Sequence, residues 1–240
     1  MGDASELEFV ALTSEGRRFG EEYVVRLGDA DEAGRLRLDG LARILQDVAT
    51  DDWSDTGVVS NDTWVVRRTA LRLVDGAEWP RYLDRLAVTT WCGGTGPAWA
   101  ERRTNVAVNS DPVLEAVALW VPTDSSGRPV RVHESFFDVY GNPARTRRVS
   151  GRVATAPIPE GATTRPWPLR AADFDVVGHV NNAALWQALS EVAHPPLRYA
   201  VVTHHRAVER GDGVTLVTGP GALWLCAGGV VAVSARFVER

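Results

Sequence analysis

Two stretches of the chain share one pattern of apolar and polar positions. Leu41, Leu45 and Val48 are spaced i, i+4 and i+7, which is the spacing of the buried face of an amphipathic helix. The same stripe returns 144 positions later, and an ungapped overlay of residues 26–49 on residues 170–193 also matches Arg, Asp and Gly residues ahead of the stripe. We therefore predict two versions of one unit, each with a short strand, a turn containing Asp and Gly, and a helix.

Each predicted helix is followed by four stretches rich in Val, Thr and Trp, residue types that favour β-strands. The stretches are residues 63–74, 84–91, 99–108 and 114–121 in the first copy, and 197–208, 213–218, 222–227 and 230–238 in the second. One helix with an antiparallel sheet, used twice, predicts an α+β fold. A single unit would leave apolar strand surface uncovered, so we expect the two units to lie side by side and complete a common core.

Residues 141–166 separate the two copies and show no apolar period. They are dense in Pro, Gly, Ser, Thr, Ala and Arg, which is typical of a linker. We therefore predict an N-terminal unit at residues 1–140, a linker at 141–166 and a C-terminal unit at 167–240.

Composition excludes several classes of protein. The formal net charge is −5, which argues against a general nucleic-acid-binding protein. No apolar run approaches the roughly 20 residues of a membrane-spanning helix, and the acidic N-terminus does not have the pattern of a signal peptide. We therefore expect a cytoplasmic protein with no membrane span. Cys92 and Cys226 are the only cysteines, too few for a disulfide framework or a zinc site.

Some side-chain types have a structural interpretation. Cys226 lies within a predicted strand and fits a small buried residue better than a nucleophile. Trp120, like the other tryptophans of the predicted strands, fits a sheet position better than a stacking platform.

All 26 basic residues are arginine, and several cluster near residues 67–72, 102–103 and 145–152. Such clusters indicate either a surface for an acidic partner or a solvated surface with scattered ion pairs.

The turn before the second predicted helix carries the candidate chemistry. Asp175 and His179 are four residues apart, with Gly178 between them, where backbone N–H groups lack intrahelical partners. Such N–H groups, here those near Gly178 and Val180, can bind the oxyanion of a thioester or ester undergoing attack. A carboxylate beside them can act as nucleophile or general base, with His179 orienting it or carrying protons. The same spacing also fits an Asp175 that only caps the helix.

The first copy distinguishes the two interpretations. It keeps the Asp and the Gly of the turn, but it has Arg35 in place of His179, and Arg-Leu in place of Asn181 and Asn182. Residues that served the fold alone would be equally useful in both copies. We therefore predict a single active site in the C-terminal unit, with the N-terminal unit as a scaffold or substrate cradle.

At these residues the sequence resembles a known family. The segment DFDVVGHVNNAALWQALSE is similar to the signature of the acyl-acyl-carrier-protein (acyl-ACP) thioesterases, a plant and bacterial family with two hotdog units in one chain. The segments TWVVRRTALRL, WPRYLDRLAVTTW, AWAERRTNV and ALWVPTDSSGRPVRV are also similar to family patterns. The resemblance implies an α+β fold of two tandem hotdog units, each a helix wrapped by an antiparallel sheet.

The resemblance also implies an activity. It implies a thioesterase that hydrolyses fatty acyl-ACP to free fatty acid and ACP, terminating fatty acid synthesis, without a metal or a dissociable cofactor. The partners would be the acyl carrier protein and the fatty acyl chain, and a homodimer is left open. An acyl-CoA thioesterase and a non-catalytic protein that binds acyl thioesters are the alternatives.

The family's catalytic Asp and His fall on Asp175 and His179. The family's Asn two residues before the His falls on Val177, and this departure favours the non-catalytic alternative. Because valine cannot position water, that role would pass to Asn181 or Asn182.

A further site position of the family lies in the strand after the second helix. Plant members carry cysteine there, whereas this chain carries Glu209, which excludes a thiol nucleophile at that position. Glu209 is a candidate for polarising His179 or activating water. Its other interpretation is a surface acid at the end of a strand.

Overall fold

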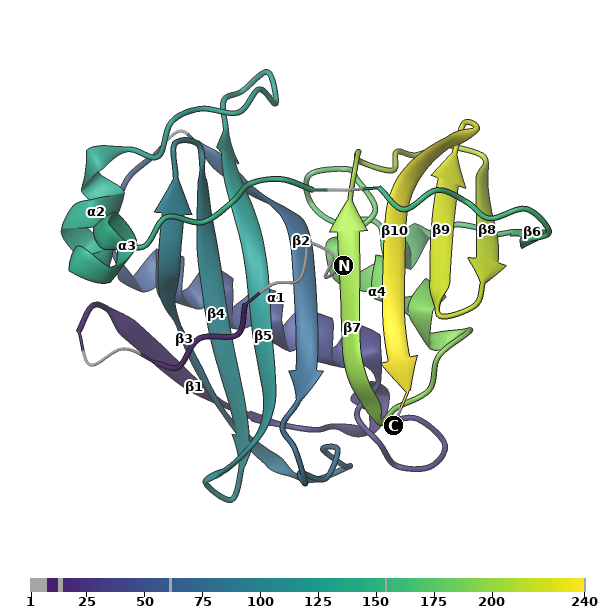
Figure 1. Ribbon diagram of the computed structural model, residues 1–240, viewed down its shortest axis with the longest axis horizontal. Helices are drawn as coiled ribbons and strands as arrows, with labels where there is room; N and C mark the ends of the chain where they lie inside the picture. The colour runs from purple at the N-terminus through teal and green to yellow at the C-terminus, as the bar shows by residue number, and fades with distance from the viewer. Residues whose placement is uncertain (1–7, 13–14, 61, 154, 240) are drawn as a thin grey trace.

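The strands of the protein form one continuous ten-stranded sheet in the computed structural model, which describes residues 8–12, 15–60, 62–153 and 155–239 (Figure 1). The order across the sheet is β1-β3-β4-β5-β2-β7-β10-β9-β8-β6, and neighbouring strands are antiparallel. Their bounds are Arg18–Val24 (β1), Thr63–Leu73 (β2), Arg85–Gly96 (β3), Trp99–Val108 (β4), Asp111–Thr123 (β5), Thr163–Pro166 (β6), Leu197–His204 (β7), Val214–Gly219 (β8), Ala222–Ala227 (β9) and Val230–Glu239 (β10).

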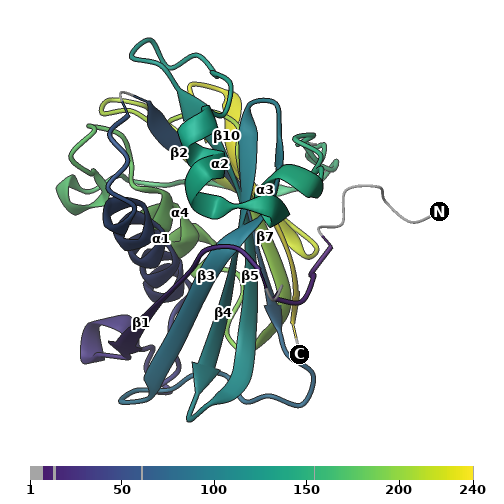
Figure 2. The same cartoon turned by 90° about the vertical axis from the view of Figure 1, so that its left-hand side faces the viewer.

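The two helices that carry the repeated pattern lie on the same face of this sheet. They are α1 (Leu38–Asp55) and α4 (Asn182–Ser190), and they pack against each other (Figure 2). The short helices α2 (Glu134–Tyr140) and α3 (Asn142–Thr146) cover the end of the sheet near β3. None of the described helices combines the length and the apolar character that a membrane crossing requires.

The two halves of the sheet have equivalent strand orders, β1-β3-β4-β5-β2 in the first half and β6-β8-β9-β10-β7 in the second, each taken from the outer edge to the centre. In the first half β1 precedes α1 and the strands β2 to β5 follow it, and in the second half β6 precedes α4 and the strands β7 to β10 follow it. The halves join where β2 pairs with β7, from Arg68 opposite Thr203 to Arg72 opposite Tyr199. The predicted α+β fold built from two copies of one unit is confirmed.

The apolar stripe of α1 faces the core as predicted. Leu41, Leu45 and Val48 are all buried, and they pack in one cluster with side chains from both halves of the sheet. The second copy is shorter than its stripe indicates, because α4 ends at Ser190 and Val192 lies beyond it. The Pro-Pro pair at 195–196 explains this early end, since proline lacks an N–H and disfavours helix in the residue before it.

The predicted linker is attached to the outer face of the sheet. It leaves through α3, crosses the strands on the side away from α1 and α4, and ends in β6, which pairs with β8 (Figure 1). The indole N–H of Trp99 donates to the Val149 carbonyl at 3.0 Å, and that of Trp224 donates to the Ala156 carbonyl at 2.9 Å. The division of the chain at residues 141–166 into two units stays a prediction.

A buried carboxylate holds together the elements around the C-terminal end of α1. Asp52 is fully buried, four residues past Val48 on the apolar stripe. It accepts hydrogen bonds from Arg17 at 2.7 Å, from Arg102 at 2.6 Å and from the Tyr140 hydroxyl at 2.6 Å. One carboxylate therefore joins α1 to β4, to α2 and to the residue before β1.

This arrangement gives a stability prediction. Replacing Asp52 with alanine leaves Arg17 and Arg102 without their buried counter-charge. The free energy of unfolding of Asp52→Ala should therefore be about 3–5 kcal/mol lower than that of the wild-type protein. Asp55 is the matched control, because it also pairs with Arg17 but its carboxylate is exposed, and Asp55→Ala should cost less than about 1 kcal/mol. Urea unfolding followed by tryptophan fluorescence measures both, and equal losses would contradict the assignment.

Candidate active site

The turn before α4 is a tight loop closed by main-chain hydrogen bonds. The Asp175 N–H donates to the His179 carbonyl at 3.0 Å, and the Gly178 N–H donates to the Asp175 carbonyl at 3.0 Å. Gly178 has a φ of +89°, a left-handed conformation that favours glycine. The turn at 31–35 forms the same two bonds, at 2.8 and 2.9 Å. The duplicated sequence therefore folds into a duplicated turn, which brings the first and last residues of each turn together.

Asp175 lies beside the start of α4 but does not cap it. Its Oδ1 accepts the Val177 N–H at 3.0 Å, and its Oδ2 lies 3.4 Å from the Asn181 side-chain amide nitrogen, which donates to it. The N-cap of α4 is Asn181, whose Oδ1 accepts the Ala183 N–H at 2.8 Å. The structure thus argues against the interpretation of Asp175 as a helix cap and makes Asn181 the residue that joins the carboxylate to the helix.

His179 and Glu209 face each other across two adjacent extended segments. They form an antiparallel bridge, and residues paired in this way have Cβ atoms about 4.5–5.5 Å apart on the same side. Among the described residues, neither side chain forms a hydrogen bond with another group. Glu209 is exposed and His179 is half-buried. The structure therefore brings these two predicted residues together, and the role of Glu209 in orienting the imidazole stays a prediction.

The first copy uses the same positions differently. Asp31 accepts hydrogen bonds from the Ala33 and Arg35 N–H groups at 2.9 and 2.8 Å and an ion pair from the Arg35 side chain at 2.9 Å. Partial burial raises the pKa of Asp31, but the hydrogen bonds from Arg35 outweigh it and the pKa is lowered overall. The residue opposite Arg35 is Arg81. In the first copy, the carboxylate of the turn is thus bonded to Arg35, and two arginines face each other where the second copy has His179 and Glu209.

The N–H groups predicted to bind an oxyanion already have acceptors in the fold. That of Gly178 donates to Asp175, and that of Val180 donates to the Val208 carbonyl at 2.9 Å. In the described part of the turn, the N–H groups of His179 and Asn182 have no such acceptor. These two become the better candidates for an oxyanion, and Asn182 begins α4, where the helix dipole adds partial positive charge.

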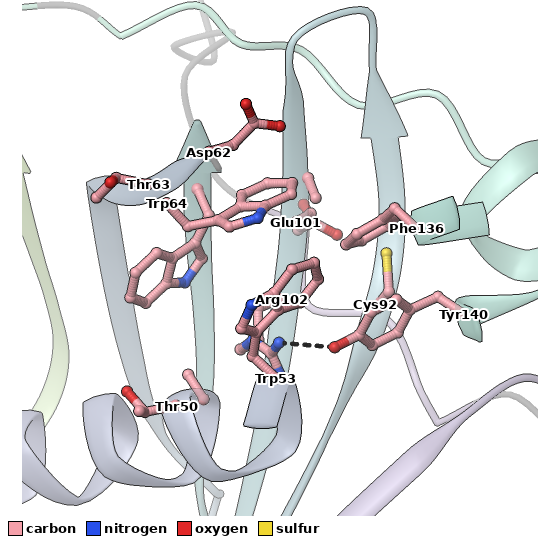
Figure 3. Close-up of a pocket in the computed structure, with 13 residues that line it drawn as sticks. Thr50, Trp53, Asp62, Thr63, Trp64, Cys92, Glu101, Arg102, Phe136 and Tyr140 are labelled. Atoms are coloured by element: carbon pink, nitrogen blue, oxygen red, sulfur yellow. Dashed lines mark hydrogen bonds between the residues drawn. The ribbon is translucent and has the colours of Figure 1, made fainter. Parts of the chain in front are cut away.

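A large cavity lies between α1, the sheet and α2 in the N-terminal half. Its volume is about 320 Å³. We call it the aromatic cavity, because Trp53, Trp64, Trp120, Phe136 and Tyr140 line it (Figure 3). The Trp64 and Phe136 rings are 5.3 Å apart, and the Phe136 and Tyr140 rings stack at 4.4 Å. Trp120 is thus part of a cavity wall, a role that its sequence pattern did not indicate.

A second, smaller cavity lies between α4, α1 and the sheet. This junction cavity has a volume of about 30 Å³ and is lined by Asn182 and Trp186 of α4 and by His204 of β7. It shares Arg102 and Trp120 with the aromatic cavity. The two cavities are therefore neighbours, and the smaller one is lined by residues of both halves of the chain.

Three arginines of these clusters pair with buried carboxylates, whereas several others are exposed. Arg102 bonds Asp52, as described above, and Arg103 and Arg147 both pair with Glu101, at 2.7 and 2.5 Å. Their pairing favours the structural interpretation of these arginines over a surface for an acidic partner. The described residues hold no group of three or more His, Cys, Asp or Glu side chains placed to bind a metal ion.

Comparison with known proteins supports one family. Residues 16–140 match the acyl-ACP thioesterase N-terminal domain. A 12:0-ACP thioesterase from Umbellularia californica superimposes with a TM-score of 0.77 at 17% identity, covering 95% of this chain and 99% of that one. An acyl-ACP thioesterase from Bacteroides thetaiotaomicron gives a TM-score of 0.75 at 19% identity, covering 92% and 97%. These two likenesses confirm the predicted fold of tandem hotdog units.

Relatives by sequence come from two strains of Mycobacterium tuberculosis. Each strain has an uncharacterized protein that is 26% identical over 220 residues, which is 88% of this chain and 86% of theirs. The similarity therefore extends over both halves of the chain.

The environment of the two cysteines predicts that neither thiol is reactive. Burial raises the pKa of Cys92 to about 12 and also raises that of Cys226. At pH 8, a thiol with a pKa near 12 is a thiolate in about one molecule in ten thousand, and the thiolate is the reactive form. Iodoacetamide at pH 8 should leave Cys92 unmodified in the folded protein and should modify both cysteines in denaturant. Mass spectrometry measures this, and rapid labelling of folded Cys92 would show an open, activated thiol.

Proposed function

The chain belongs to the acyl-ACP thioesterase family, and we propose that it hydrolyses fatty acyl-ACP at a single site, formed by the turn before α4 and the segment that carries Glu209. The difference between the two copies of the turn supports this most strongly. In the first copy Arg35 engages the carboxylate and faces another arginine, whereas in the second His179 faces a carboxylate.

Asp175 is the group we propose to activate water. Its Oδ2 has a single contact to an amide at 3.4 Å, which leaves lone pairs for a water molecule. The carboxylate removes a proton as the water oxygen attacks the thioester carbon, and the N–H groups of His179 and Asn182 stabilise the oxyanion. A nucleophilic Asp175, which would form an anhydride that water then hydrolyses, is the other role open to this carboxylate.

His179 and Glu209 serve the second half of the reaction. As the tetrahedral intermediate collapses, the C–S bond breaks and protonated His179 gives its proton to the leaving sulfur. The proton that Asp175 took from water then passes to His179, which restores both groups. Glu209, on the facing segment, holds the imidazole in the required orientation. Asn181 keeps the Asp175 carboxylate against the start of α4. The exposed valine at position 177 takes no part in these steps, because its side chain has no group that could bind water or carry a proton.

The acyl chain would extend from this site into the aromatic cavity. The junction cavity touches α4 at one end and shares two wall residues with the aromatic cavity at the other. The N-terminal unit would then act as the acyl-chain cradle for chemistry performed by the C-terminal unit. Association of two chains into a homodimer stays a prediction, which gel filtration can measure.

The duplication provides a matched pair of variants for the catalytic assignment. Asp175→Asn should lower kcat for acyl-ACP hydrolysis at least a hundredfold, because an amide cannot take a proton from water or act as the nucleophile. Asp31→Asn makes the same change in the first copy and should leave kcat within about threefold. A thiol-release assay measures both. Near-normal turnover of Asp175→Asn would remove this carboxylate from the mechanism.

Filling the aromatic cavity tests the acyl-chain cradle. Cys92→Leu adds side-chain volume to the cavity wall, so kcat/KM for the longest acyl chain that the protein accepts should fall about tenfold while shorter chains are spared. Cys226→Leu adds the same volume to a buried cluster in the other half, outside both cavities, and should change all chain lengths equally. An unchanged length profile for Cys92→Leu would place the acyl chain elsewhere.

A further inference from the structure

The wall of the junction cavity combines apolar side chains with several polar ones. Its wall includes the side chains of Gln46, Thr69, Thr104, Asn182 and His204. A saturated chain would pass this point without a hydrogen bond to any of these groups. The polar side chains in this wall therefore raise the question of which chemical group the junction cavity binds.

His204 is the strongest sign that the junction cavity is built for a polar group. It lies on the same face of β7 as the core residues Ala200 and Val202, and it is 6% exposed. Neither of its ring nitrogens has a hydrogen-bond partner among the described residues. Its neighbour His205 points to the opposite face and lies in hydrogen-bond contact with Ser234 at 2.9 Å. A buried polar group without a partner costs about 1–3 kcal/mol.

Trp120 supplies a second unpartnered group in the same wall. Its indole N–H is buried and has no acceptor in the described part of the chain. Alternation along β5 places it on the inner face with Leu114 and Ala116 of the core. The junction cavity, which both Trp120 and His204 line, has room for one or two groups of about the size of water.

We propose that the acyl chain hydrolysed by this protein carries a hydroxyl group close to its thioester, and that His204 and Trp120 bind this hydroxyl in the junction cavity. This inference rests on the proposed function, since it names the class of acyl chain that the same site takes. The cavity adjoins the first turn of α4, so the hydroxyl lies on one of the first carbons beyond the carbonyl.

One hydroxyl can bond the Trp120 indole and one ring nitrogen of His204 at once. The Trp120 N–H can only donate, so it donates to the hydroxyl oxygen, and the hydroxyl proton is donated to a ring nitrogen of His204. Burial, with the nearby charges of Arg67 and His205, lowers the pKa of His204 to about 3. The ring is therefore neutral at physiological pH and keeps a nitrogen that accepts. An oxo group has no proton to donate and would leave that nitrogen unpartnered.

The test compares three acyl-ACP substrates of equal chain length. One is unsubstituted, one carries a 3-hydroxyl group and one carries a 3-oxo group, and kcat/KM is measured for each by thiol release. A site that bonds a substrate hydroxyl discriminates against the analogue that lacks it. The wild-type protein should prefer the 3-hydroxyacyl substrate over each of the others by at least tenfold.

Two pairs of variants assign the preference to the residues. His204→Leu should bring the ratio between hydroxylated and unsubstituted substrates close to one, and His205→Leu, on the other face of the sheet, should keep the wild-type ratio. Trp120→Phe should lower the ratio several-fold. Trp91→Phe is its control, because the Trp91 indole N–H is also buried and unpartnered in the described structure but lines neither cavity.

The outcomes separate this inference from the proposed function. Hydrolysis of all three substrates at similar rates would overturn the inference and leave the thioesterase assignment in place, and so would a preference that survives in His204→Leu. A preference for the 3-oxo substrate would overturn the hydroxyl assignment. Failure of the wild-type protein to hydrolyse any of the three would count against the proposed function itself. The wild-type comparison needs no variant, so it stands even where a variant fails to fold.

Discussion

The pairing of β2 with β7 is the contact on which the arrangement of the molecule depends. Each half of the chain has one helix, and a sheet with one helix leaves apolar strand surface uncovered. When β2 and β7 pair, the two half-sheets become one, and α1 and α4 lie side by side on the same face. The first turn of α4 then shares the wall of the junction cavity with strands β2, β4 and β5 of the first half. This cavity therefore needs both units.

The duplicated turn shows how one backbone geometry supports two electrostatic states. The main-chain bonds at 31–35 and 175–179 are the same within a few tenths of an ångström. In the first turn the arginine that closes it donates to the carboxylate from both backbone and side chain, so Asp31 has little capacity left. The histidine at the equivalent position makes no such bond, and Asp175 stays available. A change of side chain, without a change of fold, thus separates a structural turn from a candidate active site.

Much of this architecture could be predicted from sequence because local pattern determines it. The strands follow runs of β-branched and aromatic residues, and the apolar stripe of α1 is buried as its spacing requires. The end of α4 was predicted less well, since the repeat indicated a longer helix and the Pro-Pro pair decided otherwise. The facing of His179 and Glu209 depends on two segments thirty residues apart, so spacing alone could not establish it.

The cavities were not predicted, because their walls come from segments that are far apart in the chain. The sequence alone does not reveal the register in which these segments pair. One signal was nevertheless present. Asp52 falls four residues after Val48 on an apolar stripe, and a charge at such a position indicates a buried counter-charge. Arg102, one of its partners, lines both cavities.

The buried polar groups around the two cavities are of two kinds. Some form hydrogen bonds with one another, and others have no partner in the described structure. Asp52, Arg102 and Tyr140 form hydrogen bonds with one another, so these groups need no hydrogen bond from a ligand. His204 and Trp120 are as well shielded from solvent at their nitrogens, yet within the described structure they have no partner. A fold retains such groups at a cost in stability. We propose that a ligand offsets this cost by bringing hydrogen bonds to both groups. Because both line the junction cavity, which also touches the first turn of α4, the proposal assigns these bonds to a hydroxyl near the thioester end of the acyl chain.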